Sequence, residues 1–278
     1  MRQHSPSAMS SAMSSTPVGR RSVLAAAAGA GAVAALAAAV PSAQAAPGRP
    51  LARPVALTVT ARPAAEAERL RLAQALRGSE FQPTGLHVPA GTPLSLTVRP
   101  HDGLLPTLWI GAWDYYGEIT EPRAHPLTAG ANTVTDPHGG PVYLTLTGHG
   151  ERADVLIRSG ALPMPVFTLG RTTEADFQRQ LDTLTASPWA ELHGPDTIMT
   201  LTRDGALQYR GEDHAALLRL IGTIIDSHAR ISGLDGSAPG ARRKAGPDHV
   251  TQVSNVPPGV GAYAPPGDNG VPPPKHDP

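Results

Sequence analysis

Short runs of β-type residues, separated by glycine and proline, set the tightest limit on how this chain can fold. Between Val55 and Leu169 these runs are VALTVTA, GLHVPAG, LSLTVRP, TLWIGAW, NTVT, VYLTLTG, ADVLIRS and MPVFTLG. Runs of this length and spacing are typical of antiparallel strands in a sandwich or barrel. The 29 glycines and 30 prolines supply enough turn residues to connect them. We therefore predict an antiparallel β-sandwich over residues 46–170.

One helix is predicted within this strand-rich region, from Ala64 to Leu76. Gly78 marks its end, because glycine readily adopts the left-handed conformation that closes a helix. The apolar residues of this segment recur at helical spacing. The face predicted to be buried holds Ala67, Leu70, Ala73 or Gln74, and Leu76.

The spacing of apolar residues changes beyond Arg171, and residues 171–234 are predicted to begin a mixed helical subdomain. Thr173 is the predicted N-cap of a helix that runs to about Leu184, because acidic residues follow it in the first turn. Trp189 is predicted to lie in a loop, and TIMTLTR to form a strand. Taken together, the two regions predict the α+β fold class.

The strongest helical pattern runs from Glu212 to about Ile231 and is closed by Gly233. Its apolar face holds Leu217, Ile221, Ile224, Ile225 and His228. Residues 235–278 are predicted to form a linker and loop, in which the run from His249 is strand-like.

The charge balance excludes one large class of function. The chain has 23 basic and 23 acidic side chains, so no excess of positive charge favours a nucleic-acid partner. It has no cysteine, and therefore no disulfide can stabilise it. Stability must come from packing or from a bound metal.

The N-terminal 45 residues have the features of an export signal. Arg20 and Arg21 precede an apolar run over residues 23–40, and Ala45 ends a small-x-small cleavage site. Paired arginines before a weakly hydrophobic run favour twin-arginine export over the general secretory route. A membrane anchor is disfavoured, because alanine and glycine contribute little to insertion. We predict cleavage after Ala45, secretion from a bacterial cell and no stable membrane insertion.

Known motifs for catalysis or metal binding are absent from the printed sequence. It contains no HExxH, CxxC, GxSxG or Walker motif. His193, His214 and His228 stand near acidic residues, but the last two are 14 positions apart, too far to share a metal across one helical turn. His228 is interpreted as a core or interface histidine, and Glu212-Asp213 as helix-start charges rather than an acid/base pair. No catalytic, metal-binding or substrate-binding residue is assigned.

Aromatic side chains gather in the stretch LWIGAWDYYG, which contains Trp109, Trp113, Tyr115 and Tyr116. Strand alternation places Trp109 on one face and Ile110 on the other. Such a strand end could stack on sugars. Because this chain has few aromatic residues, we favour the interpretation that they plug the core of the sandwich.

Three consecutive stretches of the strand-rich region form a recognisable set. They read TGLHVPAGTPLSLTV (84–98), IGAWDYYG (110–117) and RAHPLTAGANTVTDPHGGPVYLTL (123–146). Together with MPVFTLG, the two later helices and the tail from His249, they resemble the front part of the enhancin-like zinc metallopeptidases, peptidase family M60. Gly91 and the pair Gly139-Gly140 suit turns with positive φ. The strand positions predicted to face inward are Leu127, Val134 and Tyr143.

This resemblance implies a β-sandwich followed by a catalytic subdomain that cleaves glycoproteins such as mucins. In the family, a loop like the one around Ala262-Tyr263 and Gly267–Pro272 precedes the HExxH helix. That helix holds zinc through two histidines, and its glutamate takes the proton of the zinc-bound water. The printed sequence has no residues that match these, so we expect an inactive N-terminal portion that binds no zinc. The apolar faces of its helices should then be partly exposed, at Ile221, Ile224 and Ile225.

Two other interpretations stay open at this point. The chain could be an exported β-sandwich module that binds carbohydrate or protein without catalysis. It could also be a structural or interaction protein of the cell surface. Glycan or glycoprotein partners suit the peptidase and the carbohydrate-binding interpretations.

Overall fold

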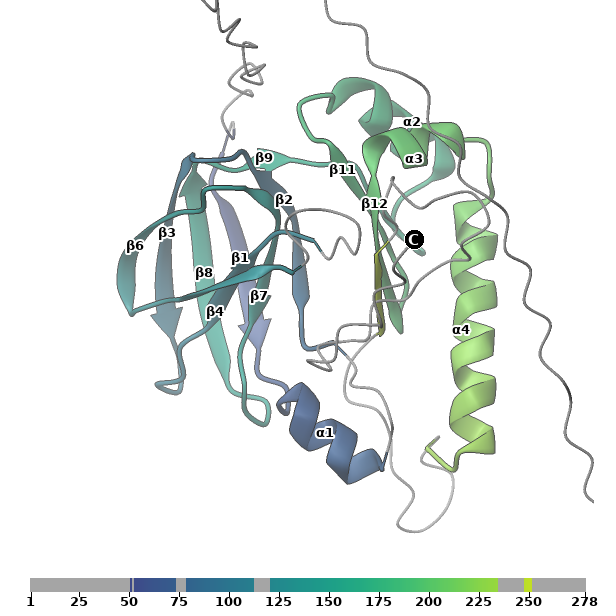
Figure 1. The fold of residues 1–278 in the computed structure, drawn as a ribbon, viewed down its shortest axis with the longest axis horizontal. Helices are drawn as coiled ribbons and strands as arrows, with labels where there is room; N and C mark the ends of the chain where they lie inside the picture. The colour runs from purple at the N-terminus through teal and green to yellow at the C-terminus, as the bar shows by residue number, and fades with distance from the viewer. Residues whose placement is uncertain (1–50, 52, 74–78, 113–120, 235–247, 252–278) are drawn as a thin grey trace, which may run out of the picture. The chain divides into compact units, whose positions relative to one another are not determined.

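The computed structural model describes residues 51, 53–73, 79–112, 121–234 and 248–251 (Figure 1). All of them belong to one compact unit, residues 44–278. The predicted signal residues Arg20, Arg21 and Ala45 lie outside the described residues. In the part of the chain that is described, none of the helices has the length and apolar character needed to cross a bilayer.

Two antiparallel sheets form the predicted β-sandwich. The strands of the first sheet, in spatial order, are β1 (Val55–Thr60), β8 (Arg152–Ser159), β3 (Pro93–Pro100) and β6 (Gly130–Thr135). Those of the second sheet are β5 (Arg123–Pro126), β4 (Thr107–Ile110), β7 (Gly140–Thr145), β2 (Gln82–Val88) and β9 (Leu162–Pro163). The α+β prediction with an N-terminal sandwich is confirmed.

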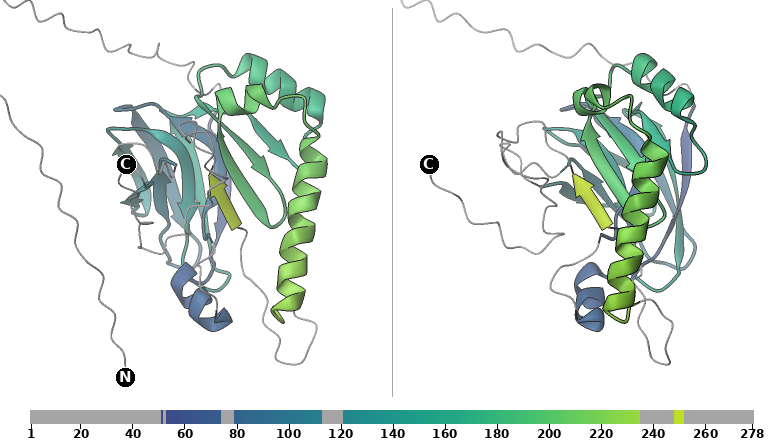
Figure 2. Two further views of the ribbon diagram at one scale, coloured as in Figure 1. Left: turned by 45° about the vertical axis from the view of Figure 1, so that its right-hand side comes forward. Right: turned by 90° about the vertical axis from the view of Figure 1, so that its right-hand side faces the viewer.

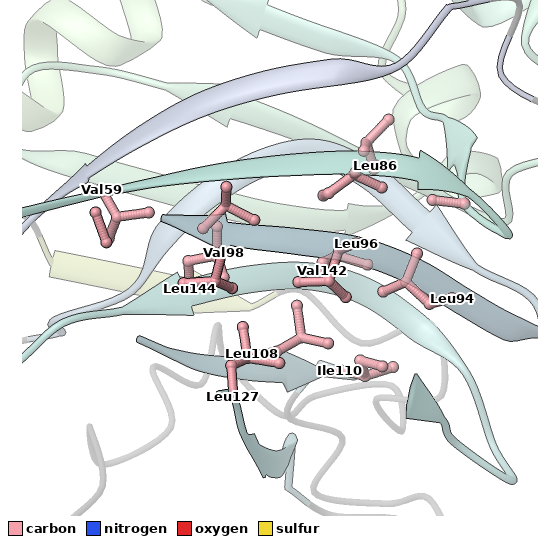
Figure 3. Close-up of a cluster of buried hydrophobic side chains, with 14 of the residues drawn as sticks. Val59, Leu86, Leu94, Leu96, Val98, Leu108, Ile110, Leu127, Val142 and Leu144 are labelled. Carbon is pink, nitrogen blue, oxygen red and sulfur yellow. The ribbon is translucent and has the colours of Figure 1, made fainter. Parts of the chain in front are cut away.

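The core of the sandwich lies between these two sheets (Figure 3). Alternation along β3 buries Leu94, Leu96 and Val98, as expected for a strand with one face on the core. Leu127 is buried in the same cluster and Val134 packs against it, so both predicted inward positions are confirmed.

Tyr143 is the exception among the predicted inward positions. It is fully buried, but its neighbours Val142 and Leu144 are the residues of β7 that face the sandwich core. Because successive side chains of a strand point to opposite faces, Tyr143 points out of the sandwich. The prediction of an inward strand position is therefore correct for burial and wrong for the face.

A third sheet follows the sandwich in the chain. Its strands, in spatial order, are β10 (Val166–Thr168), β11 (Trp189–His193), β12 (Thr197–Thr202) and β13 (Asp248–Thr251). The run MPVFTLG therefore contributes β10 to this sheet rather than a sandwich strand. Trp189 begins β11, so its predicted loop position is wrong. The strand-like run near His249 is confirmed as β13, which pairs in parallel with β12.

Helices α2 (Glu174–Thr183), α3 (Arg203–Gln208) and α4 (His214–Ile231) accompany the third sheet (Figure 1, Figure 2). The Thr173 side chain accepts a hydrogen bond from the Asp176 backbone and caps α2, as predicted. Asp213 caps α4 in the same way, which confirms a helix-start role for this residue. The helices and one face of the sheet share a second core, formed by Phe167, Phe177, Leu181, Ala190, Leu192, Leu201, Ala206 and Leu218.

Helix α1 (Ala65–Leu72) buries a different face from the predicted one. The buried residues are Ala65, Glu68 and Leu72, whereas Leu70 is 63% exposed. A count of apolar residues does not find this face, because the charged Glu68 is on it. The Glu68 carboxylate is buried while it accepts a hydrogen bond from Arg71. The helix ends at Ala73, and residues 74–78, including the predicted end at Gly78, lie outside the described part.

The predicted glycine turns are confirmed, and one of them also permits a close approach of two strands. Gly91, Gly139 and Gly140 have φ values of 66°, 67° and 131°. A Cβ atom on Gly140 would lie 2.6 Å from the Cα of Gly111. A side chain at Gly140 would therefore force the β4 end away from β7.

The second half of α4 is only partly covered. Leu220, Ile224 and Ile231 are 59%, 46% and 85% exposed, and Ile221 is half-buried. The expected partial exposure of this apolar face is confirmed. His228 is exposed as well, so of its two interpretations the core histidine is wrong and the interface histidine stays a prediction.

Candidate functional site

A buried carboxylate on the third sheet is the centre of the candidate site. Glu191 is in the middle of β11 and its side chain is fully buried. Ala190 and Leu192 pack in the second core on the helix side, so Glu191 faces the opposite way. Thr200 is its cross-strand partner on β12 and is also fully buried. This face of the sheet is therefore polar where the other is apolar.

Hydrogen bonds link this carboxylate to both sheets. His193 Nε2 lies 2.8 Å from Glu191 Oε2, and the Thr200 hydroxyl donates to Glu191 Oε1 at 3.4 Å. The Tyr143 hydroxyl of the sandwich lies 2.7 Å from Thr200 Oγ1. The resulting polar chain, Tyr143–Thr200–Glu191–His193, crosses from the second sheet to the third.

The direction of each proton in the polar chain follows from its chemistry. With the Glu191 carboxylate ionised, its oxygens only accept hydrogen bonds, and Thr200 and His193 Nε2 are then the donors. The Tyr143 hydroxyl is within hydrogen-bond distance of Thr200 Oγ1, and it also interacts with the Glu191 carboxylate. Burial, followed by the nearby charge of Glu191, raises the pKa of Tyr143 well above its usual value. Tyr143 therefore remains a phenol that can donate.

Aromatic rings surround Tyr143, the end of the polar chain that belongs to the sandwich. Phe81 stacks on Tyr143 with 5.1 Å between ring centroids and lies 5.2 Å from the ring of Trp109. Trp109 Nε1 donates to the Thr145 hydroxyl at 2.9 Å. Trp109 is half-buried on the same outward face as Tyr143, opposite Ile110. The predicted alternation is confirmed, but the prediction that Trp109 plugs the sandwich core is wrong.

Three residues of the aromatic stretch, Trp113, Tyr115 and Tyr116, lie outside the described residues. Their predicted places in the core therefore stay predictions. The same holds for sugar stacking by this stretch.

A second histidine–carboxylate pair holds two helices together. His214 Nδ1 lies 2.6 Å from Glu174 Oε2, and the Ala215 backbone donates to the other oxygen at 3.3 Å. The imidazole packs edge-on against Phe177 and tilted against Phe167. Because Glu174 belongs to α2 and His214 begins α4, this pair fixes the two helix starts to each other.

A third cluster, around Asp136, joins β5 to the turn between β6 and β7. The Asp136 carboxylate accepts from Arg123 at 2.7 and 2.8 Å and from the backbone of His138 and Gly139. His125 Nε2 lies 3.1 Å away. Although burial alone would raise the pKa of Asp136, these donors lower it to about 2. All its acceptor positions are engaged, so Asp136 is a structural anion.

The described residues do not bring together a metal centre. No group of three or more histidine, cysteine, aspartate or glutamate side chains is placed to hold an ion in this part of the chain. Of the three histidines singled out in the sequence, His193 and His214 each contact a carboxylate, and neither shares a partner with the other. The expected absence of catalytic or metal residues is not tested by this observation.

Sequence reasoning did not find Glu191, Thr200 or Tyr143 as members of one site. Alternation within β11 and β12 could have placed Glu191 and Thr200 on one face once the register of the strands was known. Contact with Tyr143 depends on how two sheets pack. No local pattern in the sequence encodes this contact.

Comparison with known families gives two consecutive matches. Residues 63–158 match the N-terminal domain of M60-like peptidases. Residues 160–272 match Peptidase M60, enhancin and enhancin-like. Among curated proteins, none matches this sequence.

Several solved structures share the fold. A conserved protein of unknown function from Bacillus anthracis str. Ames is 22% identical, with a TM-score of 0.64 over 71% of this chain and 41% of its own. The catalytic module of the metalloprotease ZmpA from Clostridium perfringens is 17% identical, with a TM-score of 0.62 over 72% and 45%. The M60 catalytic domain of ZmpC from the same organism, in complex with the sialyl T antigen, is 17% identical, with a TM-score of 0.61 over 71% and 44%. The chain thus spans less than half the length of these proteins.

Proposed function

This chain belongs to the enhancin and enhancin-like M60 peptidases, and on that premise we propose that it forms the sandwich and the first part of the catalytic subdomain of a glycoprotein-cleaving peptidase. The observation that carries the proposal is the order of the two family matches. The N-terminal domain matches residues 63–158, and the peptidase model continues over residues 160–272. The shared fold of the catalytic module of ZmpA supports the same assignment.

Zinc is the metal expected for this family, and the described residues do not fit a zinc site. Structural and catalytic zinc sites use three or four nitrogen, sulfur or oxygen ligands, and no such group is present in the described part. The printed sequence also contains no HExxH. We propose that Glu191 and His193 are not zinc ligands, and that this chain alone does not hydrolyse peptides.

Proteins that carry O-linked glycans are the proposed substrates. The ZmpC catalytic domain was solved with the sialyl T antigen, and another metallopeptidase of similar fold with the Tn antigen. We propose that this chain supplies part of the surface that receives such a glycosylated peptide. Export of the mature chain from Ala46 is proposed with it, because glycoproteins of this kind are extracellular.

Two measurements on the purified mature chain test the proposal. Saturation-transfer NMR compares a Tn-antigen glycopeptide with the same peptide without sugar, and we expect stronger transfer to the glycopeptide. Mass spectrometry of the peptides and elemental analysis for zinc follow on the same sample. We expect intact peptide and no stoichiometric zinc.

Each outcome decides between the interpretations. Cleavage together with one zinc per chain would overturn the proposal that this chain alone is inactive. Transfer to free sugars equal to that of the glycopeptide would favour a carbohydrate-binding module. Absence of binding to any of these ligands would contradict the role in receiving substrate.

A further inference from the structure

The burial of Glu191 is unusual for a contact between two sheets. A carboxylate leaves water at a large cost in free energy unless its oxygens gain partners, and an apolar side chain would fill the same space without that cost. Glu191 has those partners, Thr200 on one oxygen and His193 on the other. A buried, hydrogen-bonded carboxylate occurs in structural networks as well as at functional sites, so the surroundings of His193 decide between the two.

His193 is the end of the polar chain that reaches solvent. Its side chain is 17% exposed, whereas that of Glu191 is fully buried. In the neutral tautomer that donates from Nε2 to Glu191, Nδ1 carries no proton and is a hydrogen-bond acceptor. Among the described residues, Nδ1 of His193 has no hydrogen-bond partner. It is also not one of the buried side-chain atoms without a partner, which belong to Arg62, His87 and Thr197. The acceptor is therefore accessible.

Another histidine–carboxylate pair, His214 with Glu174, shows what a purely structural arrangement looks like in this chain. There the imidazole is buried, with 4% of its side chain exposed, and the carboxylate is 40% exposed. The second oxygen of Glu174 also binds the Ala215 backbone and so connects two helices. At Glu191 the order is reversed, since the carboxylate is buried and the imidazole faces outward.

We propose that His193 contacts the substrate through Nδ1, and that Glu191 is the positioning residue that fixes its tautomer and orientation. This inference rests on the proposed function. The ligand class is a hydrogen-bond donor of the glycopeptide, either a hydroxyl or N–H of the sugar or an N–H of the peptide backbone. Thr200 and Tyr143 fix the position of Glu191 on the side away from His193. The His193 ring is therefore oriented before the ligand binds.

Nitrogen NMR of the histidine side chains tests the proposal on the full mature chain. Without ligand, we expect the His193 signals of the tautomer that is protonated on Nε2. The Tn-antigen glycopeptide should shift the Nδ1 signal of His193 and leave that of the exposed His228 unchanged. A shift with the sugar-free peptide as well assigns the donor to the backbone, and a shift with the glycopeptide alone assigns it to the sugar.

Two variants separate contact from positioning. His193→Ala should weaken glycopeptide binding about three- to tenfold, as for the loss of one hydrogen bond, while the control His228→Ala should not. Glu191→Gln keeps the shape but replaces one acceptor oxygen by an NH2 donor, so either an oxygen or an N–H can face Nε2 of His193. His193 should then populate both tautomers, and binding should weaken while the His193 ring remains.

The proposal fails independently of the proposed function if the glycopeptide binds and the Nδ1 signal of His193 does not move. It also fails if Glu191→Gln leaves the His193 tautomer unchanged. If no peptide binds, both the contact and the role of the chain in receiving substrate are contradicted.

Discussion

The hydroxyl of Tyr143 lies 2.7 Å from Thr200 Oγ1, and through this contact the sandwich is bonded to the third sheet. Tyr143 belongs to β7 and Thr200 to β12, 57 positions apart in the sequence. Both side chains are fully buried. The two regions matched by different family models therefore share a specific polar contact rather than only apolar packing.

Tyr143→Phe should weaken this junction. The change leaves the ring stacked on Phe81 but removes the hydroxyl that is hydrogen-bonded to Thr200, so we expect the free energy of unfolding to fall by about 1–2 kcal/mol. Urea denaturation followed by fluorescence measures it. Tyr209→Phe is the matched control, because Tyr209 is 50% exposed and should lose almost nothing. Equal stabilities of the Tyr143 variant and the wild type would show that the contact contributes nothing.

Asp136→Asn should lower the free energy of unfolding by about 2–4 kcal/mol near neutral pH, because Arg123 would lose its buried counter-ion. The pKa of Asp136 is lowered to about 2, from 3.8 in an unfolded chain. Its stabilising effect is therefore complete above about pH 4 and lost as the pH falls towards 2. The difference in unfolding free energy between wild type and variant should shrink over that range.

The control for that experiment is Asp154→Asn. Asp154 also pairs with a histidine, His101, but its side chain is 45% exposed. We expect only a small loss of stability for this variant. A loss as large as that of Asp136→Asn would mean that burial does not explain the effect.

His87 should make the protein sensitive to pH in a different window. It is 3% exposed, and burial lowers the pKa of its imidazole to about 4, from 6.5 in an unfolded chain. Between these two values the unfolded chain binds the proton and the folded chain does not. Stability should therefore fall by up to about 3 kcal/mol as the pH falls from about 6.5 to about 4.

Replacement of the ring tests this window. His87→Phe should remove most of the pH dependence between about pH 6.5 and about pH 4, whereas the same change at the exposed His138 should preserve it. Urea midpoints measured across the range give the comparison. A wild-type curve that stays flat through this range would contradict the burial of a neutral His87.

The partly covered face of α4 should promote self-association. Leu220→Lys and Ile224→Lys place charges on residues that are 59% and 46% exposed, so they should reduce association with little loss of stability. Sedimentation velocity at several concentrations measures this. Leu218→Ala, on the buried side, should instead cost about 2–4 kcal/mol. A wild type that stays monomeric at every concentration would contradict the prediction.

Export provides the last prediction. Replacing Arg20-Arg21 by Lys-Lys should block secretion if the twin-arginine route is used, and the N-terminus of secreted wild-type protein should be Ala46. Immunoblots of cell and medium fractions, with N-terminal sequencing, give the answer. Unchanged secretion of the variant would indicate the general route.

Local patterns predicted the strands and helices well, and their errors have identifiable causes. Thr173 and Asp213 were recognisable as helix starts because a cap is a contact within three residues of the chain. The wrong face of α1 was predicted to be buried, because a charged residue such as Glu68 is not expected in a buried position. Its ion pair with Arg71 permits that burial. Trp189 was assigned to a loop, but it pairs with Thr202 in a sheet that also includes β10, from before α2.

The sequence by itself determined the order of the elements, the alternation that builds the sandwich core, and the resemblance to the family. These depend on residues near one another in the chain or on a pattern along it. Only the tertiary structure decided that Tyr143 faces outward, that Glu191 is buried, and that His193 is the accessible end of their polar chain. The reason is physical: which face of a strand is covered depends on the sheet packed against it, and that sheet is formed by residues more than forty positions away.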